Sequence, residues 1–275
     1  MKPEVFIDQF RASEGLTFNG EGKLFIGANR GIWIAEPDGA VRKIADVHLH
    51  LGQAGIGPRD ILAADFGPKN VFRDGPNDDG IVWRITPEGE KTADATGIAD
   101  PNAILVLPDG SYLVSDDGTD KIYRVENGRV SIWTTAVPFP NGMALSRDGN
   151  TVYVAQIFSQ IGPVVPDNSL WAISLDRLQA GAAEVVMRSE KGPDGLAADA
   201  LGRIYVADNG AGKIWRFDPR NGEKTLIAEG MPHVASLAFG EGKFDQRAIY
   251  ATSTQAGGGK VYRVRVGVKG AKLHR

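Results

Sequence analysis

The sequence lacks cysteine entirely across its 275 residues. Without thiols, disulfide bonds, thiolate metal sites and cysteine nucleophiles are excluded, and the absence fits a reducing cytosol. The sequence also has no run approaching the roughly 18 apolar residues of a membrane-spanning helix. Its first segment, MKPEVFIDQF, has acidic residues where a secretory signal would be apolar. We therefore expect a cytoplasmic protein with no membrane partner.

The sequence also has no large excess of positive or negative charge. The 31 Lys and Arg residues are nearly balanced by 34 Asp and Glu residues, which gives a formal net charge of −3 at pH 7. The basic residues are scattered along the chain, so the sequence has no cationic patch of the kind that binds nucleic acid. We expect a small molecule as the partner, and no pattern indicates an oligomeric state.

Glycine, in contrast, is abundant, and it punctuates a repeated pattern. Residues 102–130 (NAILVLPDGSYLVSDDGTDKIYRVENGRV) align with residues 194–223 (DGLAADALGRIYVADNGAGKIWRFDPRNGE) almost element by element. Each has a short apolar strand, a turn, an alternating strand, a polar loop and a third strand that contains an aromatic residue. Alternation between turn signals spaced about 8–12 residues apart predicts antiparallel sheet.

The pattern occurs six times along the chain. Repeats of roughly 40 to 50 residues with four short strands each are typical of a β-propeller. We predict an all-β fold, a six-bladed β-propeller of four-stranded antiparallel blades, formed by residues 1–275 as one domain. Residues 4–10 should pair into the last blade and close the ring. A two-sheet sandwich would explain the strands but not the sixfold repeat.

One position in each repeat precedes the innermost strand, and we call it the anchor. The anchors read from the alignment are Glu14, Asp60, Asn102, Asn141, Asp194 and Ala235. In an up-and-down blade, the start of the inner strand and the loop between the second and third strands lie at the same end of the channel. All anchors but the last should therefore present side-chain oxygen atoms at one mouth of the channel.

These oxygen donors indicate a cation site. Glu14, Asn102, Asn141 and Asp194, with Asp60 as a possible addition, form a set suited to hard cations such as Ca²⁺, Mg²⁺ or Mn²⁺. Any one of these residues alone could be an ordinary turn residue. Four of them converging on one channel favour a site, because carboxylates are seldom buried without a partner.

Other motifs are weaker. His48 and His50 would share one face of a strand, but no third metal ligand is evident, so we expect a structural role. Residues 72–80 lack the twelve-residue calcium loop with its terminal Glu. Residues 210–213 (GAGK) are followed by Ile214, where a phosphate-binding loop has Ser or Thr. No Gly-x-Ser-x-Gly nucleophile motif occurs.

The stretches SEGLTF, PNGMALSRDGNTVYVAQ and GPDGLAADALGRIYVADNG, with the ending LAFG…IYATST…GGKVYRVRVGVKG, resemble the senescence marker protein (regucalcin), gluconolactonase and luciferin-regenerating enzyme family. The resemblance implies one divalent cation at the channel mouth, with Glu14, Asn141 and Asp194 as ligands. Asn102 matches a position that lines the site in lactonases and binds calcium in a related organophosphatase. Ca²⁺ is the expected cation, with Mg²⁺, Mn²⁺ and Zn²⁺ as alternatives.

The leading hypothesis is a metal-dependent lactonase in which the cation polarises the carbonyl oxygen and Asp194 both binds the cation and accepts a proton from the attacking water. Alternatively, Asp194 is only a ligand and a metal-bound hydroxide is the nucleophile. Two alternatives stay open. The same site could hydrolyse an organophosphate or another ester, or the protein could be a non-catalytic calcium-binding module.

The substrate is expected to differ from gluconolactone. Sugar lactonases of this kind have Arg two residues before the Asn at position 102, whereas this chain has Asp100. We expect Asp100, Asn102, Phe158 and Asn209 to contact the substrate. Residues 156–169 should form a long loop whose apolar residues either cover a less polar ligand or pack against a neighbouring loop. Substrate choice should come from the loops after the second strands: 29–30, 73–79, 116–117, 156–168, 208–209 and 253–258.

Overall fold

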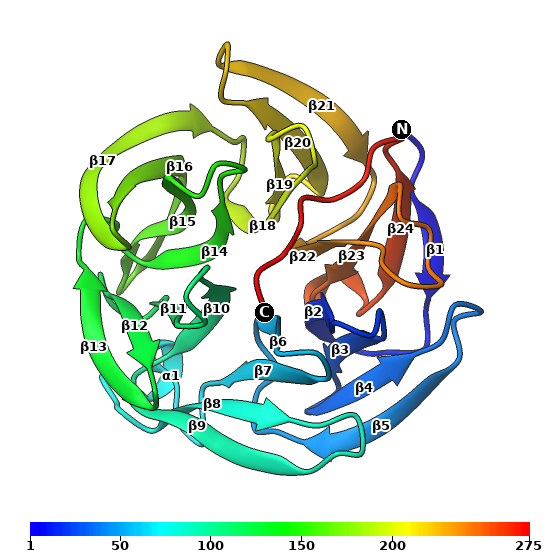
Figure 1. Ribbon diagram of the computed structural model, residues 1–275, viewed down its shortest axis with the longest axis horizontal. Coiled ribbons are helices and arrows are strands. Elements are labelled where there is room, and N and C mark those ends of the chain that lie inside the picture. The colour runs from blue at the N-terminus through cyan, green and yellow to red at the C-terminus, as the bar shows by residue number, and fades with distance from the viewer.

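The computed structural model describes residues 1–275 and confirms the predicted fold. Six four-stranded antiparallel sheets surround a central channel, and the C-terminus lies near the channel axis (Figure 1). In the first five blades the strands follow chain order from the channel outward. No helix is long and apolar enough to cross a membrane.

Blades one to three each consist of four consecutive strands. Blade one contains β2 (Ser13–Phe18), β3 (Leu24–Ala28), β4 (Gly31–Ala35) and β5 (Val41–Asp46). Blade two contains β6 (Gln53–Ile56), β7 (Asp60–Asp65), β8 (Gly80–Ile85) and β9 (Lys91–Ile98), with the short helix α1 (Val71–Asp74) between β7 and β8. Blade three contains β10 (Pro101–Val106), β11 (Tyr112–Asp116), β12 (Ile122–Glu126) and β13 (Arg129–Thr134).

Blades four to six complete the ring. Blade four contains β14 (Pro140–Leu145), β15 (Thr151–Ile161), β16 (Val164–Asp176) and β17 (Gln179–Arg188). Blade five contains β18 (Pro193–Ala198), β19 (Ile204–Asp208), β20 (Lys213–Asp218) and β21 (Glu223–Glu229). Blade six contains β22 (Val234–Phe239), β23 (Ala248–Ser253), β24 (Val261–Arg265) and β1 (Glu4–Ile7), with the 3-10 turn η1 (Gln255–Gly257) between β23 and β24.

Blade six draws its outer strand from the N-terminus, as the sequence predicts. β1 pairs antiparallel with β24, so that Glu4 lies opposite Arg263. The Glu4 carboxylate also forms ion pairs with the guanidinium groups of Arg263 and Arg265, at 2.8 and 2.6 Å. The first and last parts of the chain are thereby joined in one sheet, which leaves the ring without an open edge.

Apolar side chains fill the spaces between neighbouring blades. At the junction of blades six and one, Phe18 packs edge-on against Phe244 and Tyr250, with ring centroids 5.1 and 5.9 Å apart. Aromatic pairs of this kind contribute about 0.5–1.5 kcal/mol beyond the area they bury. Strands β3, β7, β11 and β19 are buried along nearly their whole length, and their sequences are mostly apolar instead of alternating.

The register predicted for blade two is wrong. Its inner strand is β6, and Asp60 begins the second strand, where it pairs with Ile56 at the far end of β6. Leu51 is therefore the anchor of this blade and Asp60 does not reach the predicted site. The sequence misled because β6 has only four residues and includes Gly55, whereas β7 has the continuous apolar run expected of an inner strand.

The predicted loop at 156–169 is also different in the structure. These residues extend β15 and β16 beyond the rest of the blade as a hairpin, with Phe158 paired to Pro166 and Ile161 to Val164. Its β-branched residues favour an extended backbone, so the connection shrinks to a tight turn at Gly162 and Pro163.

Candidate functional site

A shift in strand register recurs at the anchor of most inner strands. In blades one, three, four, five and six, the pairing between the first and second strands shifts register at the anchor. β6 of blade two pairs without a shift. A bulge turns a side chain away from its regular direction and is common beside active sites. Five of the six blades thus turn the backbone at the anchor, and blade two does not.

Glycines bring adjacent anchors together. A β-carbon added to Gly142 would lie 2.1 Å from the carbonyl oxygen of Asp194, and one added to Gly195 would lie 2.4 Å from that of Ala235. Any side chain there would collide with the neighbouring strand. The glycine that follows Asn141 therefore lets blade five approach, so that Asn141 and Asp194 lie on closely packed inner strands.

The four predicted site residues are withdrawn from solvent at this end of the channel, which we call the anchor mouth. Asn102, Asn141 and Asp194 are 5%, 4% and 6% exposed, and Glu14 is partly buried. Burying a carboxylate costs free energy unless it is paired or hydrogen-bonded. Two carboxylates held in this way require a compensating partner.

The acidic groups at the anchor mouth repel one another. Burial raises the pKa of the Glu14 carboxyl well above its ordinary value, and the negative charges of Asp194 and Asp117 raise it further. Burial likewise raises the pKa of Asp194 to about 7, against the lowering effect of a hydrogen bond from Asn209. No Lys or Arg side chain is among the groups that shift either pKa. The site thus concentrates negative charge without a protein cation.

Asp117 belongs to this group, although the sequence placed it only in a substrate-facing loop. It is 5% exposed, and burial raises the pKa of its carboxyl well above the ordinary value. Its Oδ2 accepts a hydrogen bond from Asn102 Nδ2 at 2.9 Å. Its Oδ1 is buried and has no hydrogen-bond partner. A bound cation nearby would offset the cost of that orphaned oxygen.

A second chain of hydrogen bonds reaches Asp194 from blades five and six. Asn209 Nδ2 donates to Asp194 Oδ2 at 2.9 Å, and Asn209 Oδ1 lies 3.2 Å from His233 Nδ1. The carboxamide therefore fixes one carboxylate oxygen of Asp194, and the imidazole fixes the carboxamide. His233 was not predicted, because only the fold brings the residue just before β22 beside the loop after β19.

Asp100 occupies a different place from the one expected. Its side chain is fully buried, with Oδ2 accepting a 2.6 Å bond from the Val71 amide and Oδ1 a 3.0 Å bond from Asn77 Nδ2. Both oxygens are thus occupied by the loop between β7 and β8. Asp100 holds that loop in place beside the anchor mouth instead of presenting its carboxylate to the channel.

The two histidines of the HLH motif lie between blades one and two. His50 Nδ1 accepts a hydrogen bond from the Arg30 amide, and burial lowers the pKa of its imidazole to about 4. His48 Nδ1 lies 3.3 Å from Asp65 Oδ2. These contacts fix the connection between the blades, as a structural role requires.

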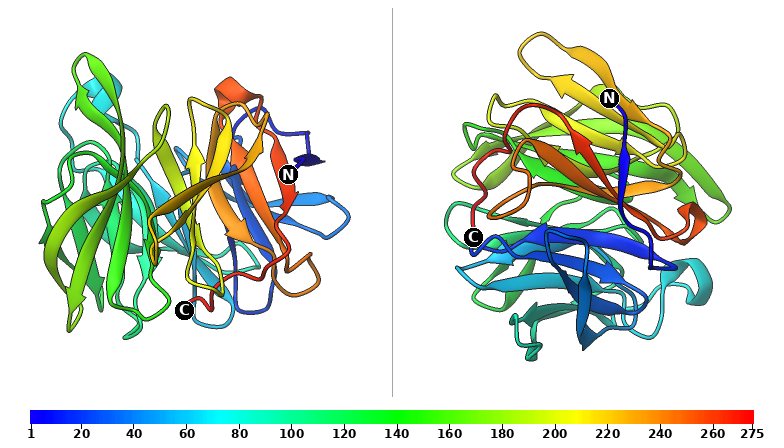
Figure 2. Two further views of the ribbon diagram at one scale, coloured as in Figure 1. Left: turned by 90° about the horizontal axis from the view of Figure 1, so that it is seen from above. Right: turned by 90° about the vertical axis from the view of Figure 1, so that its right-hand side faces the viewer.

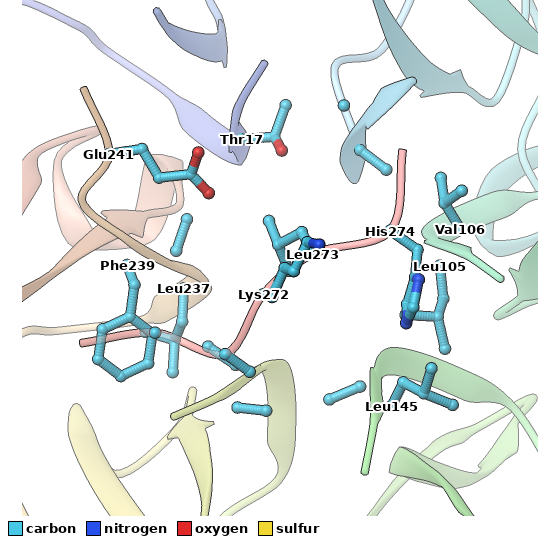
Figure 3. Close-up of a pocket in the computed structure, with 18 of the residues that line it drawn as sticks. Thr17, Leu105, Val106, Leu145, Leu237, Phe239, Glu241, Lys272, Leu273 and His274 are labelled. Carbon is cyan, nitrogen blue, oxygen red and sulfur yellow. The ribbon is translucent and has the colours of Figure 1, made fainter. Parts of the chain in front are cut away.

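A large cavity lies at the opposite end of the channel. It encloses about 790 Å³, and residues 269–275 cross it, as Figure 3 shows for Lys272, Leu273 and His274. Glu241 is the only acidic residue that lines it, and this carboxylate is paired with Arg275. We call it the far-end cavity. Its walls carry no group of carboxylates.

An apolar layer separates the two regions. The residues two positions after the anchors line the far-end cavity, and five of the six are apolar. They are Leu16, Gln53, Ile104, Met143, Leu196 and Leu237. The oxygen donors therefore lie at the start of the inner strands, above this apolar layer.

The donor set fits a hard cation in its chemistry. No group of three or more His, Cys, Asp or Glu side chains is arranged to hold a metal ion. The predicted ligands, however, include only two carboxylates, and the other two are carboxamides. Mixed carboxylate and carboxamide oxygens are typical calcium ligands, and the orphaned Asp117 Oδ1 agrees with a positive charge at this mouth.

Comparisons with known proteins identify similar sequences. The family model described as "SMP-30/Gluconolactonase/LRE-like region" matches residues 113–255. The pentonolactonase XacC of Haloferax volcanii is 26% identical over 193 residues, which are 66% of this chain and 62% of that protein. The chain spans only between half and two thirds of the length of the curated relatives it matches.

Solved structures share the fold over nearly the whole chain. Regucalcin from Agrobacterium tumefaciens, described as a calcium-binding protein, superposes with a TM-score of 0.76 at 21% identity, over 98% of this chain and 96% of its own. A gluconolactonase from Xanthomonas campestris gives a TM-score of 0.75 at 16% identity, over 98% and 89%.

Proposed function

Because the chain belongs to the SMP-30/gluconolactonase/LRE-like family, we propose that it is a cation-dependent hydrolase that opens a lactone at the anchor mouth. The observation that carries the proposal is the pair of carboxylates at the anchor mouth, the partly buried Glu14 and the buried Asp194, with raised pKa values and no Lys or Arg among the groups that shift them. The lactonase names of two relatives support the reaction class.

Four side chains would hold the cation. Glu14, Asn102, Asn141 and Asp194 supply oxygen atoms from blades one, three, four and five, and Ca²⁺ suits this set best, with Mg²⁺, Mn²⁺ and Zn²⁺ as alternatives. When bound, the cation supplies positive charge that polarises a carbonyl oxygen. Asp117 holds the Asn102 amide nitrogen, which leaves the carboxamide oxygen free to face the channel.

Asp194 is the proposed proton acceptor. As a water oxygen bonds to the carbonyl carbon, one water proton passes to the Asp194 carboxylate. The ring C–O bond then breaks, and the same proton passes to the departing alkoxide, so that Asp194 is restored. Asn209 holds one oxygen of Asp194 in place, and the carboxylate must be ionised when the water attacks.

Chelation provides the direct test. Protein treated with EDTA and then dialysed should lose proton release from a panel of lactones in a pH-stat, and Ca²⁺ should restore it. Isothermal titration calorimetry on the same sample reports whether the cation binds. Turnover that survives removal of the cation would contradict the proposed mechanism.

A non-catalytic calcium-binding role is the second candidate, favoured by the fold shared with regucalcin, which is described as calcium-binding. The same experiment separates the two, because a binding module would take up Ca²⁺ with no turnover of any lactone. Including a phosphofluoridate in the panel tests an organophosphate hydrolase, in which a phosphoryl oxygen would take the place of the carbonyl oxygen.

A further inference from the structure

Two apolar segments meet above blade three, although they come from blades two and four. The ring of Phe72, in α1, lies edge-on to the ring of Phe158, in the β15–β16 hairpin, with centroids 5.7 Å apart. Figure 2 shows α1 and the hairpin on the side of the molecule opposite the C-terminus. We call Phe72 and Phe158 the aromatic bridge.

The aromatic bridge lies at the anchor mouth. On the side of blade three, Val71 packs against Gly118, the residue after Asp117, since a β-carbon there would lie 3.0 Å from Val71 Cγ1. On the side of blade four, Gln156 pairs with Pro140, the residue before the anchor Asn141. Both segments are thus joined to residues that adjoin the donor set.

One half of the aromatic bridge, Phe72, is exposed, whereas Phe158 is partly buried. Phe72 is 43% exposed and is the only exposed aromatic side chain in the protein. Val164 and Val165, at the tip of the hairpin, are 51% and 41% exposed. Large apolar side chains gathered on a functional face commonly mark a binding surface. A contact between two loops alone would not require this exposure.

Asp100 sets the position of Phe72. Its two oxygens bind the Val71 amide and the Asn77 side chain, on either side of the aromatic residue. Asn70 caps α1 by accepting a 3.0 Å bond from the Arg73 amide. Asp100 therefore has no free carboxylate oxygen to offer to substrate hydroxyls, and it fixes the segment that carries an apolar ring.

We propose that Phe72 and Phe158 form the apolar wall of the substrate site and select lactones that carry an alkyl or aryl substituent, with Asp100 as a positioning residue that acts through α1. The inference rests on the proposed function, because it names the substrate class of that site. The lactone carbonyl faces the oxygen donors and the substituent lies against the rings. A polyhydroxylated lactone would bury hydroxyl groups against the rings without hydrogen-bond partners, which is costly.

Turnover of matched substrates tests the wall. We would compare three δ-lactones with saturating Ca²⁺: one with an alkyl chain, one unsubstituted and one polyhydroxylated. Wild-type kcat/KM should be highest for the alkyl lactone and lowest for the polyhydroxylated one. Phe72→Ala and Phe158→Ala should each lower the alkyl value about tenfold, mainly through KM, and change the unsubstituted value less than about threefold. Ile132→Ala, an exposed apolar change on the outer strand of blade three, is the matched control.

Two further variants test the positioning role. Asn70→Ala removes the cap of α1 without changing charge near the site, and Asp100→Ala removes both contacts to the loop. Both should raise KM for the alkyl lactone selectively, while kcat and the Ca²⁺ affinity measured by calorimetry stay within about threefold. Equal losses on all three lactones would contradict positioning through Phe72.

Binding of δ-lactams, which resist hydrolysis, separates this inference from the proposed function. If the alkyl lactam binds wild type more tightly than the unsubstituted lactam, and Phe72→Ala removes the difference, the wall is supported even if no lactone is turned over. Equal binding of the two lactams, or a wild-type preference for the polyhydroxylated lactone, overturns the wall even if lactone hydrolysis is confirmed.

Discussion

The two ends of the channel are made by the same six inner strands, yet they differ in almost every physical property. At the anchor mouth, buried carboxylates raise one another's pKa and Asp117 Oδ1 has no partner. At the far end, the walls are mostly apolar, and the single lining carboxylate, Glu241, is neutralised by Arg275. Cavity size would favour the far end, whereas unsatisfied charge favours the anchor mouth.

We therefore expect carboxylates without a protein cation to be a better guide to the site than cavity volume. Residues 269–275 are held by backbone pairing, as where the Ala271 amide donates to the Ala198 carbonyl at 2.9 Å, although Arg275 Nε and Gln53 Oε1 at this end are buried without a hydrogen-bond partner. Both ends thus have an unpartnered polar atom, and what distinguishes the anchor mouth is a group of carboxylates with no Lys or Arg beside them. Four predictions test this contrast.

The largest difference in activity should appear when one carboxylate is neutralised at each end and the two variants are compared. Asp194→Asn should lower kcat by about 100-fold or more, because it removes both a charged ligand and the proton acceptor. Glu241→Gln, the matched change at the far end, should leave kcat within about twofold. Steady-state kinetics on one lactone with saturating Ca²⁺ compare the two. Full activity in Asp194→Asn with the cation still bound would remove its role as the base.

Glu14→Gln should have opposite effects on stability without and with the cation. Without Ca²⁺ the variant should unfold at a higher temperature than wild type, because one of the mutually repelling carboxylates is gone. With Ca²⁺ it should unfold at a lower temperature, because its affinity should fall by roughly 100-fold with the lost charge. Thermal unfolding in EDTA and in Ca²⁺ measures both signs. The same sign in both buffers would show that Glu14 does not face the cation.

A smaller effect is expected from pH. The pKa of Asp194 is about 7 in the folded protein against an ordinary value of 3.8, so the folded state binds the extra proton between these values. Without a cation, the contribution of the Asp194 proton to the free energy of unfolding should therefore be fully present below about pH 4 and be lost as pH rises to about 7. Urea unfolding in EDTA at pH 5 and pH 8 measures the fall, and Asp194→Asn should reduce it. A rise in stability over this range would contradict the environment described for Asp194.

Much of this contrast can be predicted from the sequence, because the anchors occur at equivalent positions of the repeat. Glu14, Asn141 and Asp194 each precede a glycine, and the repeat alone places them at one mouth. The closure of the ring by residues 4–10 follows from the same count of strands. These features depend on periodicity and short-range pattern, which a single sequence displays directly.

The remainder depends on contacts between distant segments. The four-residue strand β6 has too few apolar residues to be recognised beside β7, so Asp60 was assigned to the wrong strand. Asp100 has both carboxylate oxygens hydrogen-bonded, whereas Asp117 has one oxygen without a partner. This difference comes from segments that are distant in the sequence. The contact of Phe72 with Phe158 crosses an intervening blade, and no local pattern predicts it.

The smallest effect should come from the far end itself. Leu273 is 48% exposed where the chain crosses the far-end cavity, so Leu273→Ala should change the free energy of unfolding by no more than about 0.5 kcal/mol. Lactone turnover and Ca²⁺ affinity should be unchanged, because the apolar layer that includes Leu16 and Ile104 separates this residue from the donors. Urea unfolding and calorimetry on the full chain measure both quantities. A loss of turnover would mean that the two ends are coupled through the channel. The two ends would then differ in amino-acid composition, but both would contribute to the activity.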